Sequence, residues 1–217
     1  MLGQTILDKI AVFAGLKNQF TFDFDGEENL LAMVAKGKGG ILLSAHLGNW
    51  EMAGHHLKRI NSTINIVMFD GEHEKIKKYL DGLGGKNFHV ILIKDDMSHV
   101  YQMGSALAKN ELICLHADRF MEGNKTISLK LLGEEALFPA GPFVMSAGFN
   151  VPVSVVFSFK ETNRHYHYFG SPLLQRGEEE KKSDFAVRLA NEYVKELENK
   201  IKAYPEQWFN YYDFWKK

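Results

Sequence analysis

The sequence predicts an α/β protein with a mainly parallel, mixed β-sheet flanked by helices. Short apolar runs alternate with helical segments along the chain, and this alternation is typical of strand–helix–strand units with right-handed crossovers. The chain has 217 residues, of which 45% are hydrophobic, and this suits one domain with a sizeable core. We therefore expect residues 1–217 to form a single domain.

The expected elements follow in order along the chain. The first helix should cover residues 5–16, because Ile6, Ile10 and Phe13 recur at helical spacing and Gly15 offers a stop. A stripe of this kind usually packs in a core, and the alternative is that residues 1–18 lie on a membrane surface. The further helices are predicted at residues 27–36, 51–57, 72–83, 100–108 and 183–203, and the strands at residues 20–24, 41–45, 65–69, 88–93, 112–115, 151–157 and 166–169.

The C-terminal tail, residues 204–217, is dense in aromatic side chains. We favour a tail that folds back over the sheet. The alternative is contact with the membrane–water boundary, where aromatic side chains with polar tips are common.

Composition narrows the function. The net charge is −1 at pH 7, which gives a role with nucleic acid no support. The single cysteine, Cys114, lies in an apolar run, so we expect a buried, inert thiol. No run of 18 apolar residues and no signal-peptide pattern occurs in the sequence.

Residues 39–51 carry the most chemical information. An apolar strand leads to His46, a turn follows at Gly48 and Asn49, and Glu51 lies five residues after His46. In a continuous helix this spacing would turn the two side chains about 140° apart. If His46 instead lies on the loop before the helix, Glu51 can reach one ring nitrogen. The other nitrogen can then accept a proton from a bound hydroxyl.

No protein nucleophile accompanies this pair, so the chemistry that it suggests is direct attack of an acceptor alcohol or amine on an activated acyl group. The alternative is a structural histidine. The spacing of His46, Glu51 and His55 fits none of the usual zinc patterns, so we predict no metal.

Two other segments are candidates for binding. Asp118 and Arg119 follow a strand, and they form either a structural turn or a site at which Arg119 binds a phosphate or carboxylate while Asp118 orients it. Phe138, Pro139 and Gly141 precede a predicted helix start, where backbone N–H groups can meet an anion. A turn without a ligand is the alternative there.

The stretch His46-Leu-Gly-Asn-Trp-Glu51 resembles the first motif of the bacterial lipid A (lauroyl/myristoyl-type) acyltransferases, within the lysophospholipid acyltransferase superfamily. The resemblance implies that His46 is the general base and that Glu51 orients it. It also implies an acyltransferase-like αβα fold.

The later motifs occur in the same order as in that family. Asp118–Arg119 matches a pair that lines the active-site cleft, and Phe138-Pro139 with Gly141 matches the third motif. Ala140 and Gly141 stand where glycerol-phosphate relatives carry a glutamate, which favours the lipid A-like branch. The segment 151–157 and the Pro-Glu-Gln-Trp run in the tail extend the match, which covers residues 20–217.

The resemblance implies an O-acyltransferase of lipid A and lipopolysaccharide biosynthesis. It would move a fatty acyl chain from a thioester, on acyl carrier protein or coenzyme A, to a hydroxyl of a membrane glycolipid. The donor is a co-substrate, and no cofactor is expected. Asn49 or nearby backbone N–H groups would stabilise the oxyanion. We expect peripheral membrane contact at the cytoplasmic face of the inner membrane, where family members usually have an N-terminal hydrophobic segment.

Three alternatives stay open. The acceptor can be another amphiphile, such as an amino-acid lipid or a polyene. Water as the acceptor would make a thioesterase or lipase, although the sequence contains no Gly-x-Ser-x-Gly motif. A non-catalytic lipid-binding protein would keep the cleft and tolerate the loss of His46.

Overall fold

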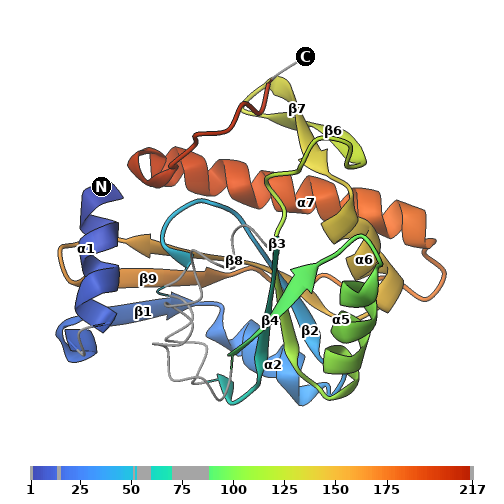
Figure 1. The fold of residues 1–217 in the computed structure, drawn as a ribbon, viewed down its shortest axis with the longest axis horizontal. Coiled ribbons are helices and arrows are strands. Elements are labelled where there is room, and N and C mark those ends of the chain that lie inside the picture. Colours follow the sequence, from blue (N-terminus) through green and yellow to red (C-terminus); the bar gives the residue numbers. More distant parts are fainter. Residues whose placement is uncertain (1, 14–15, 51, 53–59, 70–87, 216–217) are drawn as a thin grey trace.

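A seven-stranded sheet forms the centre of the computed structural model, which describes residues 2–13, 16–50, 52, 60–69 and 88–215 (Figure 1). Its strands, in spatial order, are β1 (Thr21–Asp25), β9 (His165–Gly170), β8 (Val153–Lys160), β2 (Gly40–Ser44), β5 (Leu112–His116), β3 (Ile64–Phe69) and β4 (Phe88–Ile93). The predicted helices at residues 51–57 and 72–83 fall mainly or wholly outside the described residues.

The sheet is mixed, as predicted. The strands from β8 to β4 are parallel to one another, whereas β9 runs antiparallel to β8 and β1 runs parallel to β9. The reversal between β8 and β9 follows from their short connection, residues 161–164, because a parallel pair needs a long crossover. The α/β fold class is therefore confirmed.

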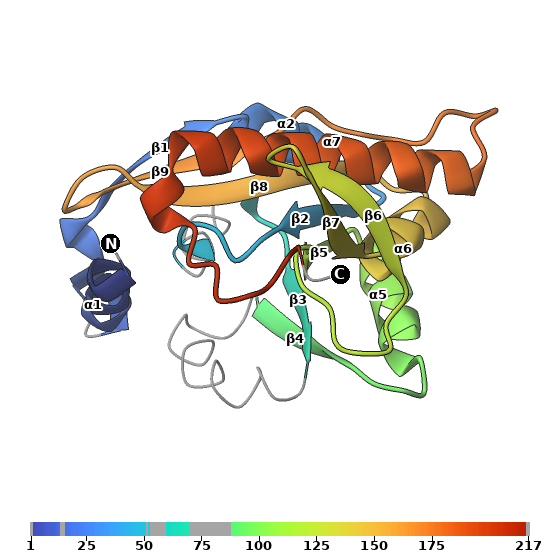
Figure 2. The same ribbon diagram turned by 90° about the horizontal axis from the view of Figure 1, so that it is seen from above.

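Helices cover both faces of the sheet. On one face, α5 (Ser98–Ala108), α6 (Gly141–Phe149) and α7 (Lys182–Ala203) share one core cluster with β2, β5 and β8 (Figure 2). On the other face, α2 (Glu27–Ala35) packs on β2, β3 and β5. The apolar stripe predicted for the last helix is confirmed in α7, whose buried residues include Phe185, Leu189, Tyr193, Leu197 and Ile201.

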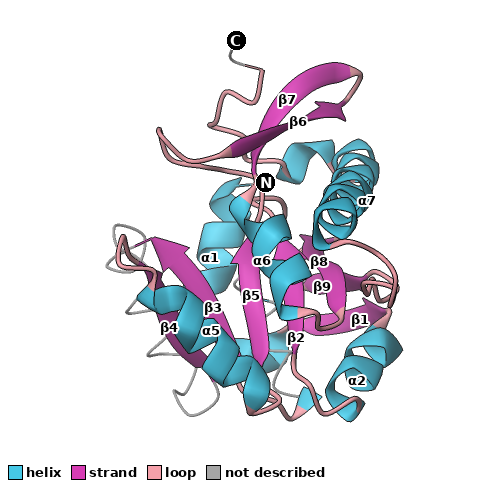
Figure 3. Ribbon diagram, turned by 90° about the vertical axis from the view of Figure 1, so that its right-hand side faces the viewer, coloured by secondary structure: helices cyan, strands magenta, loops and turns pink. Residues whose placement is uncertain are grey.

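A two-stranded hairpin of β6 (Thr126–Leu131) and β7 (Glu134–Pro139) packs against α7 (Figure 3). Its turn uses Leu132 and Gly133, both with positive φ, as a two-residue hairpin turn requires. The sequence analysis did not identify this hairpin. The hairpin leads directly into α6, so the predicted helix start after Pro139 is confirmed.

Helix α1 (Leu2–Phe13) differs from the expectation that its apolar stripe is core. Ile6, Leu7 and Ile10 are 46%, 65% and 57% exposed, whereas Thr5 and Asp8 are buried. The core prediction for Ile6 and Ile10 is therefore wrong, because the helix turns its small and polar face to the rest of the chain. Within the part of the chain that the structure describes, no helix is both long and apolar enough to span a bilayer.

The C-terminal tail folds back, which is the arrangement that the sequence analysis favoured. A short 3-10 helix (Pro205–Gln207) leads to Trp208, which pairs with Leu47, and to Phe214, which is buried in the main core. Tyr211 remains exposed. The tail therefore borders the loop that follows β2.

Phe138 gives a test of this core. Its ring is fully buried against Tyr193 and Phe214, so Phe138→Ala should lower the free energy of unfolding by about 3–5 kcal/mol. Urea denaturation measures this change. The matched control is Val187→Ala on the exposed face of α7, which should shift stability by less than about 0.5 kcal/mol. Equal effects of the two substitutions would contradict this account of the core.

Candidate active site

The register of β2 and β5 brings His46 and Asp118 together. Ser44 pairs with His116 at the carboxyl ends of these parallel neighbours, and the ladder continues as the Ala117 N–H donates to the Ser44 carbonyl at 3.0 Å. His46 and Asp118 each follow two residues after that pair. They therefore leave the sheet at the same edge, where open α/β sheets commonly bind ligands.

Asp118 holds His46 through both its backbone and its ring. The His46 N–H donates to Asp118 Oδ2 at 2.9 Å, and His46 Nδ1 lies 3.0 Å from Oδ1 and 3.1 Å from Oδ2. Burial opposes ionisation of the Asp118 carboxyl, but the hydrogen bonds and charge of His46 outweigh it, and the pKa of Asp118 lies below its usual value. An ionised carboxylate accepts hydrogen bonds only, so Nδ1 carries a proton and Nε2 is the acceptor of the neutral ring.

The sequence analysis gave the orienting role to Glu51, which lies outside the described residues; its role stays a prediction. The structure shows that Asp118 orients His46. The sequence analysis missed this contact and assigned Asp118 to Arg119 instead. In the sequence, His46 and Asp118 each lie two residues beyond the end of a strand. This pattern indicates a contact only when the two strands are known to be neighbours.

Arg119 lies beside this pair and connects it to the tail. Its Nε is 3.8 Å from Asp118 Oδ2, and one of its terminal N–H groups donates to the Phe209 carbonyl at 3.3 Å. The side chain is 30% exposed and lines the cavity described below. This position is compatible with the predicted binding of an anionic group.

Two aromatic side chains, which the sequence analysis did not select, complete the surroundings of His46. The His116 ring meets the His46 ring edge-on at a centroid distance of 4.5 Å, and Trp50 meets His116 at 5.0 Å. Burial, and secondarily the nearby His46, lowers the pKa of His116 to about 3. His116 is therefore neutral at physiological pH and packs as an uncharged ring.

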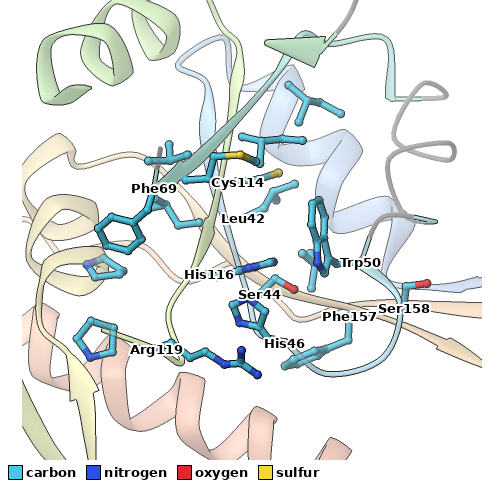
Figure 4. Close-up of a pocket in the computed structure, with 18 of the residues that line it drawn as sticks. Leu42, Ser44, His46, Trp50, Phe69, Cys114, His116, Arg119, Phe157 and Ser158 are labelled. Carbon is cyan, nitrogen blue, oxygen red and sulfur yellow. The ribbon is translucent and has the colours of Figure 1, made fainter. Parts of the chain in front are cut away.

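These residues border a cavity of about 1110 Å³ (Figure 4). His46, His116 and Arg119 line one part of it, and apolar side chains such as Leu42, Ile64, Ile66, Met68 and Phe88 line another. The cavity is large enough for a long hydrocarbon chain, and its walls are suited to one.

Cys114 also lines this cavity. Burial raises the pKa of its thiol to about 12, so the thiol stays protonated. This agrees with the expected inert thiol, because the thiolate is the nucleophilic form. The expected full burial is not observed, since Cys114 is half-buried on the cavity wall.

The third predicted segment is divided between the cavity and the core. Pro139 and Gly141 line the cavity. Phe138 is buried in the core instead, because its position on β7 directs the ring toward α7 and the tail. Phe138 therefore packs in the core next to the site and does not line the cavity, so its predicted contact with substrate has no support.

The loop of residues 46–49 is fixed by the chain around it. The Gly48 N–H donates to the Gln207 carbonyl at 2.9 Å, and the Asn49 N–H donates to the Ser158 carbonyl at 2.8 Å. Gly48 has φ of 74°, and a Cβ there would lie 2.1 Å from the Ser158 oxygen, so only glycine fits.

These contacts bear on the predicted oxyanion site. The N–H groups of His46, Gly48 and Asn49 all donate to protein oxygens. The Asn49 side chain is buried and donates to the Tyr166 hydroxyl at 3.2 Å, and Asn49 is not among the described residues that line the cavity. The geometry therefore assigns the Asn49 side chain a structural partner, and its role with an oxyanion stays a prediction.

No group of three or more metal-ligating side chains occurs among residues 2–13, 16–50, 52, 60–69 and 88–215. Glu51 and His55, which the sequence analysis considered with His46 and rejected as a metal site, lie outside these ranges. What the described residues do offer is a histidine held by a buried carboxylate, next to an apolar space. The site thus belongs to an α/β protein with a candidate general base beside a cavity that suits a hydrophobic ligand.

Comparison with known proteins agrees with this class. The family model of the bacterial lipid A biosynthesis acyltransferases matches residues 5–217. The chain therefore belongs to that family, which confirms the resemblance seen in its motifs.

Individual relatives are distant. Two proteins named phosphatidylinositol mannoside acyltransferase, from the H37Rv and CDC 1551 strains of Mycobacterium tuberculosis, are each 27% identical over 119 residues. The match covers 54% of this chain and 37% of each relative, so this chain spans well under two thirds of their length. The crystal structure of the 1-acyl-sn-glycerophosphate acyltransferase PlsC from Thermotoga maritima is 14% identical, with a TM-score of 0.47 over 90% of this chain and 82% of that chain.

His116 predicts a pH dependence of stability. Because its pKa is near 3 when folded and near 6.5 when unfolded, the unfolded chain binds a proton between these values that the folded chain does not. Stability at this position is therefore lost as the pH falls. His116→Gln should flatten the decline in the free energy of unfolding between about pH 7 and pH 4 relative to the unmodified chain. Urea denaturation at several pH values checks this, and parallel curves for the two proteins would contradict it.

Proposed function

We propose that this chain transfers a fatty acyl group from a thioester donor to a hydroxyl of a membrane lipid. The observation that carries the proposal is the His46 ring, which a buried, ionised Asp118 orients beside a large apolar cavity. Family membership supports acyl transfer as the reaction.

In the proposed reaction, Nε2 of His46 takes the proton from the acceptor hydroxyl. The acceptor oxygen forms a bond to the thioester carbonyl carbon, and the tetrahedral intermediate then loses the sulfur as the C–S bond breaks. The leaving thiolate then accepts this proton from the His46 imidazolium. Until that transfer, the Asp118 carboxylate stabilises the imidazolium. The products are an acylated lipid and a thiol, and no further reactant is required.

The cavity accounts for the acyl chain. Each methylene that leaves water contributes about 0.8 kcal/mol to binding, so a long chain on the apolar wall around Leu42, Ile66 and Cys114 is a strong anchor. We place the thioester carbonyl near His46 and the hydrocarbon along this wall. Arg119 is then close enough to the reacting end to bind a phosphate or carboxylate of donor or acceptor.

The donor that we propose is acyl carrier protein or coenzyme A charged with the acyl group. The acceptor that we favour is a glycolipid such as a lipid A precursor, which makes the cytoplasmic face of the inner membrane the expected location. The name of the mycobacterial relatives refers to a mannoside of phosphatidylinositol, which is also a glycolipid. An amino-acid lipid or a polyene as acceptor, and a non-catalytic lipid-binding protein, are the alternatives.

Mass spectrometry of total lipids from cells that express this chain tests the reaction. We expect lipid species heavier by one acyl chain with the unmodified protein, and their mass identifies the acceptor. His46→Ala should reduce these species by about 100-fold or more, because general base catalysis contributes that much. Asp118→Asn should also reduce them.

Two further variants sharpen this experiment. Cys114→Phe places a ring in the cavity and should shift the products to shorter acyl chains, whereas Cys114→Ala should not shorten them. Equal lipid profiles for the unmodified protein and a folded His46→Ala variant would reject catalysis by His46. Product made of released fatty acid alone would identify a thioesterase.

We also propose that α1 touches the membrane surface. Ile6, Leu7 and Ile10 form an exposed apolar face on this helix, and the proposed acceptor is a membrane lipid. Ile6→Asp with Ile10→Asp should lower co-sedimentation with phosphatidylglycerol–phosphatidylethanolamine vesicles several-fold, because burying the apolar face drives such binding. The control is Val187→Asp on the exposed side of α7. Unchanged binding in the double variant would exclude this face as the contact.

A further inference from the structure

A buried chain of hydrogen bonds runs from α1 to the loop that carries His46. The Asn49 side chain donates to the Tyr166 hydroxyl at 3.2 Å, and the Tyr166 hydroxyl donates to Asp8 Oδ2 at 2.5 Å. The Lys160 ammonium group forms an ion pair with the same carboxylate and donates to the Asn163 carbonyl at 2.8 Å. Three elements and one loop thus meet: α1, β8, β9 and residues 46–49.

The groups of this hydrogen-bond chain are almost entirely shielded from water, so each relies on the others for its hydrogen bonds; Asp8, at 9%, is the most exposed of them. Tyr166 and Asn49 are 0% and 1% exposed, and Lys160 is 3% exposed. Burial, and then the bond to Asp8, raises the pKa of Tyr166 far above its usual value. The hydroxyl therefore stays protonated and donates a hydrogen bond to Asp8. Its oxygen then accepts from Asn49, and consecutive bonds of this kind strengthen one another.

The charge balance depends on α1. Asp8 is the carboxylate that neutralises the buried Lys160 ammonium group, and a buried charge without its partner is strongly unfavourable. If α1 were displaced from the sheet, Lys160 and Tyr166 would therefore lose their common acceptor. The side of α1 that carries Asp8 is the opposite of the exposed apolar side.

The other end of this hydrogen-bond chain is the loop that carries His46. Asn49 is three residues from His46, and its backbone N–H is held by Ser158, two residues before Lys160 on β8. Gln207 adds a second connection, because its side chain bonds the N–H and the carbonyl of Lys160 at 2.9 and 2.8 Å while its own carbonyl accepts from Gly48. The end of β8 near Lys160 therefore links α1, the tail and the loop.

We propose that Asp8 and Tyr166 are positioning residues for the His46 loop, so that the docking of α1 on the sheet controls the turnover of the enzyme. Neither residue touches the reacting atoms. Each acts through Asn49, which fixes the turn that follows His46. The inference rests on the acyl transfer proposed above for its effect on rate, but not for its effect on the loop.

Hydrogen exchange followed by mass spectrometry tests the effect on the loop without any substrate. Tyr166→Phe and Asp8→Asn should each raise the exchange rate of the amides in residues 44–50 by about tenfold, because local opening sets that rate. The matched control is Tyr204→Phe, which removes a hydroxyl that bonds Glu161 at 3.1 Å. Exchange of residues 112–116 in β5 should stay unchanged in all three variants. Unaltered exchange of residues 44–50 would overturn the proposal.

Kinetics then separates positioning from a general loss of stability. The probe is transfer of the palmitoyl group from palmitoyl-coenzyme A to a detergent-dispersed total lipid extract of the expressing cells. Tyr166→Phe should lower kcat by about tenfold and change the KM for the donor by less than about twofold, the pattern expected when a group acts in the transition state alone. A kcat equal to that of Tyr204→Phe, or a rise in KM alone, would overturn the proposal.

Double variants test the chain of bonds. Because Asp8, Tyr166 and Asn49 act in series, Tyr166→Phe combined with Asn49→Ala should lose no more kcat than the more damaging single variant. If Asn49 instead binds the oxyanion, its loss will add to that of Tyr166→Phe. A folded His46→Ala variant as active as the unmodified chain would reject the proposed function, whereas the exchange experiment would still decide the role of the bond chain.

Discussion

The pairing of β2 with β5 is the constraint on which the rest of the site depends. It places His46 and Asp118 two residues beyond the pair Ser44–His116, so that the buried Asp118 carboxylate meets the His46 ring just past the ends of the two strands. The regular hydrogen bonds of a parallel ladder fix the register of two strands and so the relative position of their ends. The candidate base therefore owes its orientation to the register of two central strands of the sheet.

The loop after β2 is the second level of organisation. Its backbone donates to Asp118, Gln207 and Ser158, so it is fixed from β5, from the tail and from β8. Polar groups in a buried loop must find such partners, because an unsatisfied donor there costs about 1–3 kcal/mol. Because these backbone N–H groups already donate to protein oxygens, they are not available to a ligand in this arrangement.

The apolar cavity and the exposed face of α1 give the molecule two hydrophobic surfaces of different kinds. The cavity lies on the sheet beside His46, and the face on α1 looks outward. Hydrogen bonds connect α1 to the loop that carries His46, because the inner side of the helix carries Asp8, which bonds Tyr166, and Tyr166 in turn bonds Asn49. The helix that we propose to touch the membrane and the loop that carries His46 are thereby connected within one buried polar cluster.

The sequence by itself determined the α/β class, the positions along the chain of the seven strands of the main sheet, the stripe of α7 and the choice of His46, because apolar periodicity and local motifs are properties of neighbouring residues. Tertiary structure alone decided that Asp118 orients His46, that Asn49 bonds Tyr166, that Phe138 belongs to the core and that Ile6 and Ile10 face outward. These outcomes depend on which strands are neighbours and which helix face finds a partner. Such contacts join residues far apart in sequence, and no local pattern encodes them.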